Sequence, residues 1–584
     1  MADFKSDIRD GMRIDWDVPI TMADGNVLRA DVFRPVKAGR YPVLMTHGPY
    51  AKWLHFEDRF DEQWKRMVAK YPEVATDTSS HYQNWEVVDP EKWVPDGYVC
   101  IRIDSRGAGR SPGLLDVWSA QERSDFAECI EWAGKQKWSN GKVGLNGISY
   151  YAMNAWQVAG VRPKHLAAVC IWEGAGDFYR EMAYHGGIFS TFAATWYVRQ
   201  VMTVQHGVGE RSNRSRMTGE FVAGPDTLTE EELRANRRDL GADMLAAPLA
   251  TDPFWTSRMP DYANINVPVL SSANWGGQGL HPRGNFEGWL ETGSKDKWLE
   301  VHGIEHWTHF YTDYGLDLQK RFFGHYLKGE KNGWNKQPRV QLQIRHPGEK
   351  FVERQEKEWP LARTRWTKFY LDPARDALTT DKPVAEAKAS YRALGDGGTY
   401  LTPAFDRETE ITGPIAAKLW VSSSTTDADL FLVVRVFSPD LTEVVFQGAL
   451  DPHTPVAQGW LRASHRKLDK KKSLPYRPYH THDAVQKLSP GEVYELDIEV
   501  WPTCIVVPKG YRVALTVRGK DYRWPGAEAG GQVQLQGRVF SGVGPFKHDD
   551  GRNRPLPEFD GDITLHTGPK MPAHVLLPII PAQK

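Results

Sequence analysis

The sequence predicts two successive domains, an α/β domain and then an all-β domain, and three observations support this. In residues 1–336, short apolar runs alternate with helical patterns, which is typical of a mostly parallel sheet covered by helices. After residue 337, short alternating segments lie between clusters of Pro, Gly and Asp, as in a β-sandwich. Finally, 584 residues are too many for one hydrophobic core.

The α/β domain is expected to begin with a hairpin. The turn residues Met22–Asn26 separate the strand-like segments Val18–Thr21 and Val27–Phe33. Buried strands are then predicted from apolar runs at Tyr41–Thr46, Tyr98–Ile103, Val143–Leu145, Leu166–Ile171, Val267–Ala273 and Trp298–Val301. A helix is predicted over Ala120–Lys135, because its apolar residues recur at helical spacing.

One segment interrupts this alternation. Residues 178–262 are rich in Met, Arg, Phe and Trp at helical spacing, which predicts a helical cap inserted over the C-terminal edge of the sheet. The α/β domain is therefore expected to comprise residues 1–177 and 263–336. Residues 337–584 are predicted to form a jelly-roll, from segments such as Val340–Ile344 and Leu430–Phe437.

Composition excludes several classes of protein. The formal net charge is -1 and no long basic run occurs, which argues against nucleic acid as a partner. The N-terminus shows no apolar signal region, and no run of eighteen apolar residues could span a membrane. The 4 cysteines are scattered, so they are interpreted as reduced core residues instead of a disulfide framework or metal site. A cytoplasmic protein is expected.

The most informative motif lies at Lys142–Ala152. A short apolar strand leads into Gly147-Ile-Ser149, and a helix-compatible segment follows from Tyr150. This layout is typical of a nucleophile elbow, in which a strained turn raises a serine hydroxyl above the sheet. The usual second glycine is replaced by Tyr151, and the small residue comes one position later. The motif predicts Ser149 as a nucleophile, the alternative being a structural turn serine.

A serine nucleophile needs a base, and α/β-hydrolases carry it in the loop after the last strand. The strand at Lys297–Gly303 precedes such a loop, so His306 is the predicted base. His302 would lie within the strand, His309 one helical turn further on, and His281 in the preceding loop is a rival. A structural, hydrogen-bonded role for His306 is the alternative.

Two donors are expected to hold the oxyanion of the reaction. One is the backbone N–H of Tyr150, directly after the nucleophile. The other is the hydroxyl of Tyr50, in the loop that follows the strand Tyr41–Thr46; the alternative is a tyrosine that closes the core. The glycine-rich loop Asp104–Gly113 lacks the Gly-Lys-Ser/Thr of phosphate-binding loops, so it is interpreted as a structural loop beside the site.

A family resemblance joins these motifs. The sequence resembles the CocE/NonD hydrolases, relatives of cocaine esterase, α-amino-acid ester hydrolases and X-prolyl dipeptidyl peptidases, over nearly the whole chain. The matching motifs are Pro49-Tyr50, Asp104–Gly113, Trp138–Gly141, Gly147–Ala152, Asp177–Arg180 and Gly303–His306. The resemblance implies an α/β-hydrolase core, a helical cap and a jelly-roll, with the site between them. It also implies a tyrosine hydroxyl in the oxyanion hole, at Tyr50.

The sequence departs from that family at the triad acid. The resemblance implies an aspartate after the next-to-last strand, but Ala273–His281 contains no carboxylate. Glu173 ends the strand Leu166–Ile171, next to the elbow strand in the expected sheet, and is the predicted acid. Glu287 and Glu305 are alternatives, and an ion-paired structural role for Glu173 also remains open.

These residues predict a serine hydrolase that cleaves a small-molecule ester or amide through an acyl-enzyme, with no metal or organic cofactor. The runner-up is an amino-ester hydrolase or dipeptidyl-peptidase-like activity, in which Asp177 or acids near Glu57–Glu62 would hold an α-ammonium group. The missing aspartate also leaves open a catalytically silent binding protein. Specificity is expected to reside in the cap and in the insertion Lys52–Asp96. The oligomeric state stays open, a homo-oligomer included.

Overall fold

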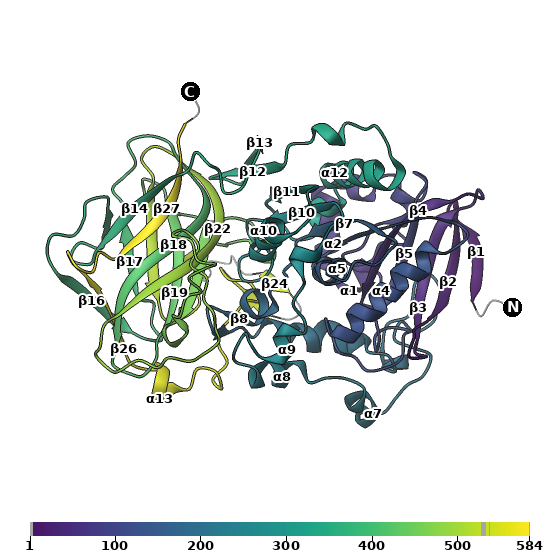
Figure 1. Cartoon of the computed structure of the whole chain (residues 1–584), viewed down its shortest axis with the longest axis horizontal. Coiled ribbons are helices and arrows are strands. Elements are labelled where there is room, and N and C mark those ends of the chain that lie inside the picture. The colour runs from purple at the N-terminus through teal and green to yellow at the C-terminus, as the bar shows by residue number, and fades with distance from the viewer. Residues whose placement is uncertain (1–3, 527–532, 536–537, 583–584) are drawn as a thin grey trace.

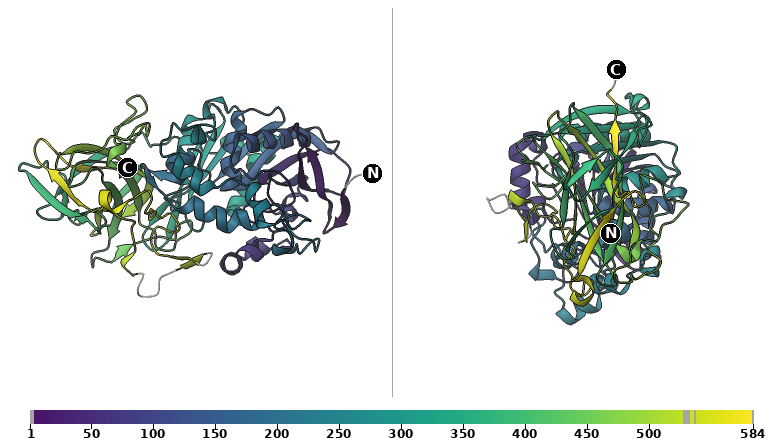
Figure 2. Two further views of the ribbon diagram at one scale, coloured as in Figure 1. Left: turned by 90° about the horizontal axis from the view of Figure 1, so that it is seen from below. Right: turned by 90° about the vertical axis from the view of Figure 1, so that its left-hand side faces the viewer.

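The structure is a computed structural model that describes residues 4–526, 533–535 and 538–582. Two lobes lie side by side along the long axis of the molecule (Figure 1). The lobe on the right in Figure 1 carries the N-terminus at its far end, and the lobe on the left is a β-structure that carries the C-terminus. The same division is seen from below in Figure 2.

The first lobe is built on one large sheet. Its strands, in spatial order, are β1 (Lys5–Arg9), β2 (Met12–Thr21), β3 (Val27–Pro35), β5 (Val99–Asp104), β4 (Tyr41–Gly48), β6 (Ser139–Ile148), β7 (Leu166–Trp172), β10 (Val269–Asn274), β11 (Lys297–His302), β12 (Val340–His346) and β13 (Lys350–Glu356). The strands from β5 through β12 run parallel, and antiparallel strands flank them. The predicted hairpin and the six predicted buried strands are confirmed.

Helices cover both faces of this sheet (Figure 1). The main ones are α4 (Ala120–Gly134), α5 (Tyr150–Gly160), α10 (Pro282–Glu291) and α12 (Asp313–Phe323). Helix α4 confirms the predicted helix: it begins at Ser119, whose hydroxyl accepts from the N–H of Glu122, and it buries Phe126 and Cys129. Neighbouring residues of a strand enter cores on opposite faces, as Leu44 and Met45 of β4 do.

Two excursions from the sheet rest near its C-terminal edge. Lys52–Asp96 contains α1 (Phe56–Arg59), α2 (Asp61–Lys70) and α3 (Pro90–Trp93). Residues 178–262 contain α6 (Phe192–Trp196), α7 (Glu230–Ala235), α8 (Leu240–Ala246), α9 (Pro253–Thr256) and a small pair of strands, β8 (Tyr184–His185) and β9 (Ile188–Phe189). The segment predicted as a helical cap is thus made of short helices and turns.

The second lobe is all-β, as predicted. Its strands are β14 (Arg365–Asp372), β15 (Ala377–Thr379), β16 (Ala387–Arg392), β17 (Gly398–Leu401), β18 (Thr409–Ser423), β19 (Asp429–Phe437), β20 (Glu443–Val444), β21 (Ala457–Arg462), β22 (Tyr494–Val507), β23 (Arg512–Arg518), β26 (Asp562–Thr567) and β27 (His574–Ile580). Because β27 pairs with both β14 and β18, the hydrogen-bonded path closes into a barrel. A separate hairpin joins β24 (Val533–Leu535) to β25 (Arg538–Phe540).

The boundary predicted at residue 337 is too early. Val340–Ile344, expected in the all-β domain, belongs to β12, which pairs in parallel with β11 of the first sheet. Period-two alternation identifies a strand but does not say which sheet it joins. Here Leu342 packs between the lobes, in one apolar cluster with Val506 of β22. The structural boundary therefore falls between β13 and β14.

Within the described residues, no helix is long and apolar enough to cross a membrane. Cys100, Cys129, Cys170 and Cys504 are buried free thiols.

Candidate active site

Ser149 stands at the sharp turn between β6 and α5. Its backbone has φ 57° and ψ -111°, a left-handed conformation that is strained for a residue with a β-carbon. A β-carbon on Gly147 would lie 3.1 Å from the carbonyl oxygen of Glu86 and 2.6 Å from Tyr151 Cβ. The crowding explains why glycine precedes the serine. The local geometry is that of the nucleophile elbow expected from the sequence.

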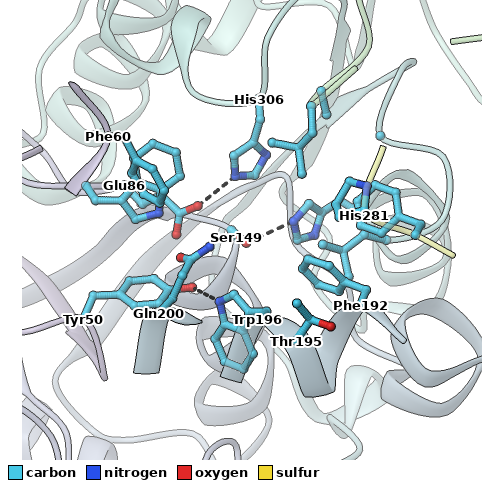
Figure 3. A pocket seen from close by; sticks show the side chains of 17 residues that line it. Tyr50, Phe60, Glu86, Ser149, Phe192, Thr195, Trp196, Gln200, His281 and His306 are labelled. Carbon is cyan, nitrogen blue, oxygen red and sulfur yellow. Dashed lines mark hydrogen bonds and ion pairs between the residues drawn. The ribbon is translucent and has the colours of Figure 1, made fainter. Parts of the chain in front are cut away.

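Ser149 lines a pocket where three parts of the chain meet, with about 720 Å³ of empty space including its mouth. The pocket walls come from the first sheet's loops, from the cap and from the barrel lobe: Tyr50, Phe60, Trp85, Glu86, Gly277, Leu280, His281 and His306; Phe192, Thr195, Trp196 and Gln200; and Ala449, Leu450, Pro545 and Phe546. The largely apolar lining suits a small organic substrate. Figure 3 shows Ser149 between His281 and the Glu86–His306 pair.

Backbone hydrogen bonds connect the barrel lobe to the two loops that carry His306 and Gly276. The N–H of His306 donates to the carbonyl oxygen of Ala449 at 3.0 Å, and the N–H of Ala449 donates to Gly276 at 3.1 Å. A β-carbon on Gly276 would lie 2.3 Å from the Cα of Gly448. The two lobes therefore meet backbone to backbone beside His306.

The imidazole nearest to Ser149 is that of His281. Its Nε2 lies 3.0 Å from Ser149 Oγ, and its Nδ1 is buried with no hydrogen-bond partner among the described residues. Burial and the charge of His306 lower the pKa of His281 well below its usual value. A buried lone pair without a partner is less costly than a buried orphan N–H, so Nε2 carries the proton and donates to Ser149.

His306 lies in the loop after β11, as predicted, but a carboxylate holds each of its ring nitrogens. Nδ1 is 2.7 Å from Glu173 Oε2, and Nε2 is 2.8 Å from Glu86 Oε1 (Figure 3). Burial opposes the charged imidazolium, yet the two carboxylates prevail and raise the pKa of His306 to about 10. The rings of His281 and His306 stack with centroids 5.2 Å apart.

The direct contact expected between Ser149 and His306 is therefore not the one formed in this structure. Ser149 bonds to His281, the rival in the preceding loop, because Glu86 occupies the His306 nitrogen that would face the serine.

Glu173 follows β7 and is brought to His306 as the sequence analysis expected. It is fully buried at φ 51°, and it also accepts from His302 Nε2 at 3.2 Å and from Asn274 Nδ2 at 3.1 Å. Burial raises the pKa of its carboxyl, but His306 and His302 outweigh this effect and hold it well below the usual range. Asn274 belongs to the stretch that lacks the expected aspartate, so an amide there supports an acid supplied by the neighbouring strand.

Glu86 is a site residue that the sequence analysis missed. It lies in the insertion Lys52–Asp96 and is 2% exposed, and no described residue forms a hydrogen bond with its Oε2. Burial raises the pKa of its carboxyl above the usual value, against the opposing effect of His306. The sequence offers only a weak signal, which is that Glu86 stands between the apolar residues Trp85 and Val87.

The two expected oxyanion donors lie at the site. The hydroxyl of Tyr50 accepts from Trp196 Nε1 at 3.0 Å and lines the pocket, which leaves its own proton available for donation. Burial, and then the charge of Glu86, raise the pKa of Tyr50 well above its usual value, so the proton is retained. Tyr150 opens α5, where backbone N–H groups have no partner within the helix. Its side chain points away, to Glu122 at 2.7 Å.

The remaining titratable residues considered from the sequence have other partners. The ion pairs with arginine are Glu287–Arg477, Asp177–Arg180, Glu57–Arg216 and Asp58–Arg216. Glu305 accepts a hydrogen bond from Thr308, His302 bonds to Glu300, and His309 lies against Thr312. None of them lines the pocket. Among the described residues, no group of three or more His, Cys, Asp or Glu is arranged to hold a metal ion.

Two family models match the chain, and they divide it between residues 311 and 332, before β12. Residues 24–311 match the X-Pro dipeptidyl-peptidase (S15 family) model. Residues 332–576 match the model for the X-Pro dipeptidyl-peptidase C-terminal non-catalytic domain.

Whole proteins match over almost their full length. A CocE/NonD family hydrolase from Staphylococcus aureus is similar in structure, with a TM-score of 0.84 and 31% identity, over 100% of this chain and 97% of that one. Cocaine esterase from Rhodococcus sp. (strain MB1 Bresler) is 24% identical, over 96% of this chain and 98% of that protein. A solved α-amino acid ester hydrolase shares the fold at 14% identity, with a TM-score of 0.67 over 99% of this chain and 97% of that one.

Proposed function

Because the chain belongs to the CocE/NonD family of hydrolases, we propose that it cleaves a carboxylic ester through an acyl-enzyme formed on Ser149. The observation that carries the proposal is the strained Ser149 elbow, which opens into an apolar pocket beside the His306–Glu173 pair. The strand order β3-β5-β4-β6-β7-β10-β11, with the elbow after β6, supports an α/β-hydrolase core.

The proposed reaction runs in two halves. Ser149 Oγ attacks the ester carbonyl as His306 Nε2 takes its proton, and the same proton then passes to the leaving alcohol. The oxyanion accepts hydrogen bonds from the Tyr50 hydroxyl and the Tyr150 N–H. In the second half, His306 deprotonates a water molecule, which attacks the acyl-enzyme and releases the acid.

His306 is proposed as the base, although His281 is the closer imidazole. A base must hold the imidazolium that forms, and this requires an acceptor on its Nδ1. Glu173 supplies that acceptor to His306, whereas the Nδ1 of His281 is buried with no partner among the residues that the structure describes. His281 is proposed to position the Ser149 hydroxyl.

A simple ester is favoured over an α-amino substrate. The acids suggested from the sequence for holding an ammonium group, Asp177 and Glu57, are ion-paired to arginines and do not line the pocket. Glu86 is the carboxylate among the described pocket residues, and it already bonds to His306. We propose ester hydrolysis as the main activity and amide hydrolysis as a weaker one.

A substrate panel tests the proposal. Purified protein is assayed with p-nitrophenyl esters of increasing acyl length and with amino-acid and X-Pro p-nitroanilides, and Ser149→Ala is the control. Ester turnover that disappears in Ser149→Ala is expected, together with fluorophosphonate labelling of wild type alone. A folded protein with neither labelling nor turnover would instead establish the catalytically silent alternative. Faster anilide than ester turnover would overturn the proposed preference.

A further inference from the structure

Glu86 occupies the ring nitrogen that the proposed nucleophile needs. In a serine hydrolase, the base presents one imidazole nitrogen to the serine and the other to an acid. Here Glu173 holds His306 Nδ1 at 2.7 Å, but Glu86 instead of Ser149 holds Nε2, at 2.8 Å. Ser149 lies against His281. One nitrogen therefore has two competing partners, a carboxylate and a hydroxyl.

The position of Glu86 is fixed by the elbow itself. Its carbonyl oxygen accepts from the N–H of Ile148 at 3.0 Å, and its neighbour Val87 forms a β-bridge with Gly147. Its φ of 64° is unfavourable for a residue with a β-carbon, which indicates that the surrounding packing imposes this placement. Its Oε2 is buried with no hydrogen-bond partner within residues 4–526, 533–535 and 538–582. The Glu86 carboxylate is therefore held in place beside Ser149 by the backbone contacts with β6.

We propose that Glu86 is a positioning residue that shares His306 Nε2 with Ser149 and keeps His306 in the imidazolium form until substrate binds. The inference rests on the proposed function. On substrate binding, the proton shared by the pair moves onto Glu86, which leaves His306 neutral with a free lone pair on Nε2. Ser149 Oγ then replaces Glu86 at that nitrogen. Its proton passes to Nε2 as the Oγ–C bond forms, and onward to the leaving oxygen as the C–O bond breaks.

The charges around the pair allow the proton to rest on either group. Burial and the charge of Glu173 favour protonated Glu86, while His306 and the Arg59 guanidinium favour the ionised form. The titratable and charged groups that face the pair from all sides are Glu173, His302, His281, Arg59, Tyr50, Tyr151 and Tyr311. Because Glu173 remains with His306 throughout, Glu86 is the group whose removal changes the Nε2 side alone.

Glu86→Gln tests the proposal, because it keeps the shape of the side chain and removes its charge. Glu86 stabilises the imidazolium and so raises the pH above which His306 is a neutral base. Loss of one neighbouring carboxylate shifts a pKa by roughly 1–3 units. The acidic limb of the kcat/KM profile should therefore move to lower pH by about that amount. KM should stay nearly constant, and fluorophosphonate labelling at pH 6 should quicken about tenfold or more.

Two further variants act as controls. Glu305→Gln removes an equivalent carboxylate next to His306 in the chain, one that bonds to Thr308 instead of to the imidazole. In this variant the acidic limb of the kcat/KM profile should lie at the same pH as in wild type. Glu86→Asp retains the charge on a shorter side chain, so its limb should lie between those of wild type and Glu86→Gln.

The proposal is overturned if the acidic limb of the kcat/KM profile stays in place in folded, active Glu86→Gln. It is also overturned if kcat falls by the same factor at every pH, because that result indicates a purely structural role. A histidine-selective ¹⁵N NMR titration provides a readout that does not require turnover. A lower His306 pKa in Glu86→Gln supports the coupling even if ester hydrolysis fails in wild type, so the two proposals can fail separately. An unchanged His306 pKa rejects the coupling whatever the activity.

Discussion

The two sides of Ser149 differ in charge. On one side, His306 is held between the carboxylates of Glu173 and Glu86. On the other side, His281 is neutral, and its second nitrogen has no partner in the part of the chain that the structure describes. The uncharged side makes the hydrogen bond to the serine, while the charged side can hold a positive imidazole. The comparison teaches that a short distance to Ser149 is not enough to choose the base. The proposed assignment of His306 rests instead on its ability to stabilise the imidazolium.

Replacing each histidine by alanine tests this comparison most directly. His306→Ala should lower kcat on the order of 10⁴–10⁶-fold, because proton transfer is lost. His281→Ala should lower it about 10- to 100-fold, because only the position of the Ser149 hydroxyl suffers. Steady-state kcat values for one p-nitrophenyl ester decide the matter. The reverse order of effects would make His281 the base.

Removing charge from the acid should have the next largest effect. Glu173→Gln is expected to reduce kcat about 10⁴-fold, because the base loses its tautomer and its counter-charge. Glu287→Gln is a matched control, since Glu287 pairs with Arg477 away from the pocket, and it should keep wild-type kcat. Equal kcat losses in the two variants, or a change in thermal stability alone, would assign Glu173 a structural role.

Tyr50→Phe tests the proposed oxyanion hole and should have a smaller effect than His306→Ala or Glu173→Gln. Loss of the hydroxyl should lower kcat about 10²–10³-fold with little change in KM, because this hydrogen bond forms mainly in the transition state. Trp196→Phe removes the N–H that holds the hydroxyl and should give a smaller loss of the same kind. An unchanged kcat in Tyr50→Phe removes Tyr50 from the oxyanion hole.

Sequence patterns predicted much of the first lobe because its signals are local. Strands β4 to β7 appear as apolar runs, and the Gly147-Ile-Ser149 turn needs only its own neighbours to be recognised. Glu173 could be selected because the ends of neighbouring parallel strands meet at one edge of the sheet. The register of β6 with β7 indeed brings Ile148 beside Trp172, one residue before each side chain of interest.

The remainder depended on packing between distant segments. Glu86 carries no motif, and its place at the site follows from the bond between its carbonyl and Ile148. His281 reaches Ser149 because the β10–α10 loop is compact beside the barrel lobe, where Gly276 meets Gly448. The sheet to which β12 belongs was likewise decided by its contacts with β11 and β22. Hydrophobic alternation and residue spacing in a single sequence do not predict contacts between segments that are far apart in the chain.

The hydrogen bond from the N–H of His306 to Ala449 joins the barrel lobe to the loop of the proposed base. Each lobe has a hydrophobic core of its own, so the interface between them can loosen before either core melts. Because the loop that carries the base is anchored across this interface, heat inactivation should precede global unfolding. The working temperature of the enzyme would then be limited by the junction between its lobes and not by the stability of the sheet that carries Ser149.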